Sequence, residues 1–111
     1  MVVRSELSED EVDRIFRAIA DATRRDILRR TLERAASVSQ LASSYDMSFA
    51  AVQKHVAVLE AAGLVTKTSK GRERLIRGSP ETLERARTLL DQYEQIWRDR
   101  IARLDALLTE D

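Results

Sequence analysis

A cluster of positive side chains is the part of the sequence best suited to binding a charged ligand. Residues 66 to 77 carry five of them against the single acid Glu73, a local net charge of +4 in a chain that is neutral overall. Such a patch attracts phosphates, because neutralised phosphates release counterions. The alternative is a solvated hairpin whose charges keep an edge strand soluble. The five residues are Lys67, Lys70, Arg72, Arg74 and Arg77.

A short helix is predicted shortly before this patch. Ser37 is followed three residues later by Gln40, which is the spacing of a capping box. The helix therefore runs from about Val38 to Ser44. The next three residues, Tyr45-Asp46-Met47, suit the turn between two helices.

A second helix is predicted from Ser48 to Ala62, with Ser48 as its N-cap. Val52, Val56 and Leu59 recur at steps of four and three, which places them on one buried face. The other face carries small residues, an amide and one lysine, so it can approach a DNA major groove closely. The alternative is an ordinary amphipathic surface helix, which has the same pattern of residues. The outward face comprises Phe49, Ala50, Gln53, Lys54 and Ala57.

A β-hairpin is predicted directly after this helix. Gly63 suits the left-handed residue that ends a helix, and Leu64-Val65 begin an extended segment. The turn is predicted at Ser69-Lys70-Gly71 and the second strand from Arg72 to Arg77. A positive hairpin beside a candidate recognition helix favours phosphate binding over a merely solvated edge.

Two runs of residues resemble a known family. The run from Met47 to Val65 resembles the recognition helix and following strand of the ArsR/SmtB family of bacterial winged-helix repressors. The run from Ile19 to Leu28 resembles that family's second-helix signature. The resemblance implies a winged helix-turn-helix that binds double-stranded DNA. Phe49 and Ala50 depart from the polar residue and the proline common at those places, so a base preference is not carried over.

The predicted DNA contacts lie in the recognition helix and the hairpin. Gln53 is the expected reader of adenine or another base edge, and the hairpin is expected to bind phosphates or an adjacent minor groove. The single histidine, His55, is either a hydrogen-bond donor close to DNA or a packing residue on the flank of the helix. The full set is Ser48, Phe49, Ala51, Gln53, Lys54 and His55 in the helix, and Lys70, Arg72 and Arg74 in the hairpin.

Two further helices are predicted before the helix-turn-helix. Ser8 opens a capping box with Glu11, and an apolar stripe indicates a helix from about Ser8 to Ala20. In the resembled family this helix contributes to the dimer interface, whereas packing within one subunit explains the stripe equally well. Asp21 can cap the second helix.

The second helix is rich in arginine. Arg24 and Arg25 are its first candidates for contacts with the DNA backbone. The alternative is a solvated face on which the arginines pair with Asp26 and Glu33.

A long helix is predicted at the C-terminus. Ser79-Pro80-Glu81 is a helix-opening signal, and neither proline nor glycine follows before about Leu108. Its apolar stripe is too long to bury on so small a domain, so we expect it to pair with the same helix of a second copy related by a two-fold axis. A cofactor pocket lined by Trp97 is the alternative. The predicted dimer interface comprises Ile15, Phe16, Leu90, Tyr93, Trp97, Ile101 and Leu104.

Composition limits the other classes of function. A chain of 111 residues with 43% hydrophobic content is expected to form one domain with a modest core. It has no cysteine, which excludes disulfides, thiolate metal sites and a cysteine nucleophile. There is no apolar run long enough for a signal peptide or a membrane span, so a cytoplasmic protein is expected. Without a glycine-rich phosphate loop or a His and carboxylate cluster, we expect neither an enzyme, a cofactor nor a metal site.

The predicted fold is mainly α, a winged helix-turn-helix with about five helices and a two-stranded hairpin. Residues 1–111 form one domain, with the core and wing at 8–78 and a dimerisation helix at 79–110. The predicted function is a homodimeric, sequence-specific repressor of transcription, and footprinting of the DNA beside its own coding region tests autoregulation. The rivals are a winged-helix protein-interaction module without DNA binding and a repressor induced by a small organic ligand. The sequence does not identify an effector.

Overall fold

The computed structural model describes residues 7–109. Within them the mainly helical, winged helix-turn-helix fold is confirmed, with the five predicted helices and one strand more than predicted. Residue 110, the predicted end of the dimerisation helix, lies outside the described residues. Every helix of the described part is too short or too polar to cross a lipid bilayer. The elements are α1 (Glu9–Ile19), α2 (Ala22–Glu33), β1 (Ala36–Ser37), α3 (Val38–Ala42), α4 (Phe49–Ala61), β2 (Val65–Lys70), β3 (Glu73–Gly78) and α5 (Pro80–Thr109).

The predicted capping residues begin the first four helices. Ser8, Asp21, Ser37 and Ser48 have extended backbones, and each side chain accepts a hydrogen bond from the N–H three residues later. The boxes at Ser8 and Ser37 are reciprocal, because the acid or amide at the third helical position accepts from the cap in return. These bonds satisfy N–H groups that a first turn leaves unpaired, so four short polar side chains fix where the helices start.

The core lies between the helices and the sheet. Apolar residues from α2, α3, α4, the turn after α4 and the sheet are at most 1% exposed, namely Ile27, Leu41, Val52, Val56, Leu59, Leu64, Val65 and Ile76. Ile15 of α1 is only 1% exposed and belongs to the same core. A side chain so enclosed by its own chain offers almost no surface to a second copy, in contrast to the neighbouring Phe16, which is 36% exposed.

The predicted two-stranded hairpin is confirmed, and a third, unpredicted strand joins it in the sheet. β2 and β3 form the antiparallel hairpin, in register from Val65 opposite Gly78 to Lys70 opposite Glu73. β1 pairs with the other edge of β3, which gives the order β1-β3-β2. β1 is two residues long, too short to show the alternation by which a strand is recognised.

The hairpin turns slightly later than predicted. β2 continues to Lys70, and Gly71 and Arg72 are the two residues between the strands. Gly71 has a φ of 63°. Arg72, at the second position, does not have a positive φ, so this two-residue turn is of type II′, which matches the twist of paired strands. Lys70 and Arg72 consequently lie at the tip of the wing.

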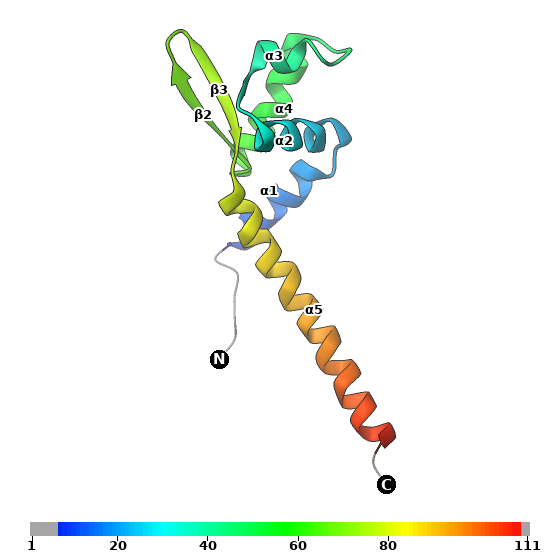
Figure 1. Cartoon of the computed structure of the whole chain (residues 1–111). Helices are drawn as coiled ribbons and strands as arrows, with labels where there is room; N and C mark the ends of the chain where they lie inside the picture. The colour runs from blue at the N-terminus through cyan, green and yellow to red at the C-terminus, as the bar shows by residue number, and fades with distance from the viewer. Residues whose placement is uncertain (1–6, 110–111) are drawn as a thin grey trace.

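The first turns of α5 are joined to the end of α4. Buried Thr82 donates from Oγ1 to the carbonyl of Gly63 at 2.6 Å, and the N–H of Ser79 donates to the carbonyl of Leu64 at 2.8 Å. Gly63 has a φ of 75° and ends α4 in the predicted left-handed conformation. Beyond these turns α5 extends away from the other elements (Figure 1), and its large apolar side chains from Leu90 onward are exposed.

Candidate nucleic-acid interface

One face of α4 is open to solvent and carries four of the nine predicted DNA contacts. Phe49, Gln53 and Lys54 are exposed, together with the N-cap Ser48, while Val52, Val56 and Leu59 point into the core as predicted. The centre of the exposed face is made by Ala50 and Ala57. Small side chains there leave the helix backbone free to approach the floor of a major groove.

A groove of about 300 Å³ lies between α4 and the wing. Phe49 and Gln53 line it from α4, and Arg72 and Arg74 line it from the hairpin. The structure thus brings together four predicted contacts from two separate elements. Lys70 is exposed near the tip of the hairpin, beyond this lining.

The positive charge of the wing is concentrated near its tip. Lys67, at the base of the groove, has its Nζ 3.4 Å from Oε1 of Glu60 on α4, so an acid already matches its charge. Lys70, Arg72 and Arg74 are exposed. Because their side chains stand in water, these three can gain a phosphate partner at little cost in lost hydration.

Ala51 and His55 lie off the exposed face. Both are half-buried, and Nδ1 of His55 is 3.3 Å from Nη1 of Arg24 on α2. Since a guanidinium can only donate, Nδ1 accepts this bond and the ring proton is on Nε2. The structure therefore places His55 between two helices, as the packing interpretation has it.

Arg24 and Arg25 hold the end of α1. Arg24 donates from Nε to the carbonyl of Ala18 at 2.7 Å and from Nη2 to that of Arg17 at 3.1 Å, while Arg25 donates to the carbonyl of Ile19 at 2.7 Å. The last carbonyls of a helix lack intrahelical partners and lie at the negative end of its dipole, so hydrogen bonds from both arginines stabilise the C-terminus of α1. Sequence spacing gave no sign of this role, because it depends on the turn between α1 and α2.

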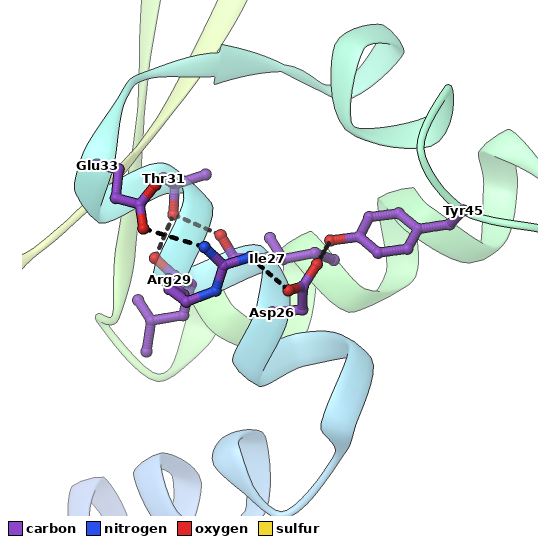
Figure 2. Close-up of polar contacts among 7 residues, drawn as sticks. Asp26, Ile27, Arg29, Thr31, Glu33 and Tyr45 are labelled. Carbon is purple, nitrogen blue, oxygen red and sulfur yellow. Dashed lines mark hydrogen bonds and ion pairs between the residues drawn. The ribbon is translucent and has the colours of Figure 1, made fainter.

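A polar cluster ties the turn of the helix-turn-helix to α2 (Figure 2). Arg29 lies between Asp26, at 2.8 Å, and Glu33, at 3.0 Å, which is the predicted solvated pairing. The hydroxyl of Tyr45 donates to the other oxygen of Asp26, and the guanidinium of Arg30 lies over the Tyr45 ring, 5.4 Å from its centre.

This cluster shifts two pKa values in opposite directions. The hydrogen bond from Tyr45, and then that from Arg29, lowers the pKa of Asp26 below its ordinary value. Burial, and then the bond to Asp26, raises the pKa of Tyr45. Asp26 thus remains ionised and Tyr45 remains protonated near neutral pH, which keeps the turn before α4 in place.

The predicted dimer contacts other than Ile15 are open to solvent. The exposed fraction is 36% for Phe16 of α1, and it lies between 43% and 59% for Leu90, Tyr93, Trp97, Ile101 and Leu104 of α5. Ile96, Leu107 and Leu108 are more exposed still. A contiguous apolar stripe of this length on one protruding helix marks an interaction surface.

The described residues offer no metal centre. Between residues 7 and 109, no three side chains of His, Cys, Asp or Glu lie close enough together to hold a metal ion.

Comparison with known proteins finds similarity over most of the chain. Residues 19–68 match the model of a helix-turn-helix domain. The HTH-type transcriptional regulator Rv2034 of Mycobacterium tuberculosis is 37% identical over 81 residues, 73% of this chain and 76% of that protein. The uncharacterized HTH-type transcriptional regulator YuzN of Bacillus subtilis is 40% identical over 79 residues, 65% of this chain and 86% of that protein. The solved structure of an ArsR-like transcriptional regulator from Rhodococcus sp. RHA1 superposes with a TM-score of 0.80 at 31% identity, covering 88% of this chain and 92% of that one.

Proposed function

The chain belongs to the ArsR family of winged helix-turn-helix transcriptional regulators, and from that premise we propose that it is a homodimeric repressor that reads double-stranded DNA with α4 and the wing. The groove shared by Gln53, Arg72 and Arg74 is the observation that carries the proposal. It joins a side chain able to read a base to two cations able to hold phosphates.

The contacts divide between base reading and positioning. The Gln53 amide can pair in a bidentate way with the N6 and N7 edge of adenine, because it both donates and accepts. Lys54, on the other side of the exposed face, and Lys70, Arg72 and Arg74 of the wing bind the backbone or an adjacent minor groove. Ser48 lies at the N-terminus of α4, where a phosphate also meets the positive end of the helix dipole.

The apolar stripe of α5 supports pairing with a second copy, because it is symmetric about one residue. Counting outward from Trp97, apolar residues occur four positions away, at Tyr93 and Ile101, and seven away, at Leu90 and Leu104. Two antiparallel copies with Trp97 on the two-fold axis therefore place an apolar residue opposite each of these positions.

The residues that flank the apolar stripe of α5 are also compatible with antiparallel pairing. At 100° per residue, Arg87, Glu94, Arg98 and Asp105 fall on one side of the stripe. Antiparallel pairing brings Arg87 near Asp105 of the second copy, and Glu94 near Arg98 of the second copy. The opposite side is apolar and carries Leu89, Ile96 and Leu107. Acids thus meet bases on one side and apolar side chains meet on the other.

A dimer of this kind presents two copies of α4 to one duplex. A two-fold protein matches a palindromic site whose half-sites lie one helical turn, roughly 34 Å, or a multiple of it apart. Occupation of such a site blocks other proteins from the same DNA, which is the simplest route to repression. Control by a Cys or His metal site is not part of the proposal, since the chain has no cysteine and its one histidine contacts Arg24.

The test is a titration with duplex DNA at a series of salt concentrations. Lys54→Ala and Arg72→Ala are expected to weaken binding to all sequences and to flatten the dependence of log K on log salt by about one unit per lost contact, hence about two per dimer. Arg103→Ala, which removes an equal charge from the distal part of α5, is the matched control and should keep the slope. If the protein showed no salt-dependent binding to duplex DNA, the result would favour a protein-interaction module instead.

Gln53→Ala should relax preference at one base-pair position while the salt slope is retained. Selection of binding sites from a random duplex library measures this. An unchanged preference profile would contradict base reading by Gln53.

A further inference from the structure

Phe49 is a large apolar side chain in an unexpected place. It is the first residue of α4, and 48% of its surface is exposed. The position before the helix cap is occupied by Met47, which packs against the core that contains Val52 at the fourth helical position. Met47 and Val52 occupy the two positions of a hydrophobic staple, before the cap and at the fourth helical residue, and neither position involves Phe49.

The surroundings of Phe49 are those of the DNA-facing groove. Gln53, one turn later on α4, lines the same groove, with Arg72 and Arg74 across from them. Lys67 and one acid, Glu73, also line this groove, so cations outnumber acids there three to one. An aromatic ring in such surroundings suits a ligand that is anionic overall and has an apolar edge. The first residues of a recognition helix are also those that contact base edges in the major groove.

Only one apolar group stands on the major-groove edges of the four ordinary base pairs, the C5-methyl of thymine. We propose that Phe49 reads this methyl group and makes the protein prefer a 5-methylpyrimidine at the base pair next to the one that Gln53 contacts. The proposal rests on the DNA binding proposed above and adds a second specificity-determining residue to it. 5-Methylcytosine presents the same methyl at the same place and should satisfy Phe49 equally.

The methyl can be removed from DNA without any other change. After an operator has been selected from random duplexes, each thymine is replaced singly by deoxyuridine. Burying one methyl against an aromatic ring is worth about fourfold in affinity, so replacement in both half-sites of a palindrome should weaken binding roughly fifteenfold. The loss should be confined to one symmetric pair of thymines.

Variants of the protein separate Phe49 from its neighbours. Phe49→Ala should bind the thymine and deoxyuridine operators equally, whereas Phe49→Leu should keep part of the difference. Gln53→Ala is the matched control: it should lose preference at its own base pair and keep the sensitivity to deoxyuridine. Thermal unfolding of each variant checks that the fold is retained. We expect little change in the unfolding temperature, because the substituted side chains are exposed.

The outcomes distinguish the two proposals. If the protein binds its operator with unchanged salt dependence but tolerates deoxyuridine at every thymine, the reading by Phe49 is wrong and the proposed function stands. The same conclusion follows if Phe49→Ala keeps the full sensitivity. If no duplex is bound even at low salt, the proposed function is wrong, and so is the proposal that Phe49 contacts a thymine methyl group.

Discussion

Replacing Trp97 by cysteine is expected to yield a dimer that oxidation links through a single disulfide. The chain has no cysteine of its own, so a single introduced thiol reports only on its contact with the same thiol of a second copy. In the antiparallel pairing proposed for α5, residue 97 lies on the two-fold axis and faces itself. The remaining apolar residues of the stripe keep the two helices together when the indole is lost.

The proposed pairing of α5 also predicts which other positions of the stripe can form a disulfide between the two copies. A helix rises about 1.5 Å per residue, and Leu90 lies opposite Leu104 of the second copy, fourteen residues away. Two copies of Leu90→Cys therefore hold their thiols about 21 Å apart along the axis. A disulfide requires Cα atoms within about 7 Å, so this variant should not link to itself. An equal mixture of Leu90→Cys and Leu104→Cys should form a linked heterodimer.

The assay is mild oxidation at micromolar concentration followed by electrophoresis without reductant. The expected order is efficient linkage for Trp97→Cys, little for either other variant alone, and efficient linkage for their mixture. In a parallel pair each position faces itself, so Leu90→Cys would link to itself as readily as Trp97→Cys, and the mixture would give little heterodimer. Self-linkage of Leu90→Cys as complete as that of Trp97→Cys would refute the register, and a monomer throughout would refute the homodimer.

Two further predictions concern the stability of the fold. Gly78→Ala should lower the free energy of unfolding, measured with urea, by about 1–3 kcal/mol, because a Cβ at Gly78 would lie 2.6 Å from Cγ of Leu32 and 3.0 Å from its backbone nitrogen; Gly71→Ala, at an open but left-handed position, tests strain without a clash. Asp26→Asn should make the free energy of unfolding depend less on pH in acid. The pKa of Asp26 is lower in the folded state than in the unfolded state, where it is near 3.8, so the ionised carboxylate stabilises the fold above that pH. This contribution is lost as the pH falls through the pKa of the folded state. Urea unfolding from pH 2 to pH 7 measures the difference, and parallel profiles for the two proteins would contradict it.

Features that depend on a few neighbouring residues were predictable from the sequence. The four N-caps, the left-handed Gly63 and the buried face of α4 each follow from short spacings, because the hydrogen bonds or contacts involved join residues three or four apart. The open apolar stripe of α5 follows in the same way, since its spacing is helical and its large apolar side chains from Leu90 onward are exposed.

Features that depend on tertiary contact were missed. β1 is two residues long and exists because β3 offers it an edge. Ile15 and Phe16 are adjacent on the same apolar stripe, yet one is in the core and the other is partly exposed. Likewise, His55 is recognisable as a packing residue only once Arg24 is seen beside it. In each case the deciding neighbour is far away in sequence, where periodicity carries no information.

The contacts between α4 and α5 connect the two halves of the proposed function. The recognition helix ends at Gly63, whose carbonyl accepts from Thr82 at 2.6 Å, and Leu64 accepts from Ser79 at 2.8 Å. No flexible linker therefore separates the reading helix from the helix that pairs the two copies. A change in the angle at which the two α5 helices cross must move both copies of α4 relative to the duplex. Since the half-sites lie a whole number of helical turns apart, even a small rotation at the dimer axis would cost contacts in both grooves at once. The pairing of α5 is thus the place where an effector would gain control over DNA binding.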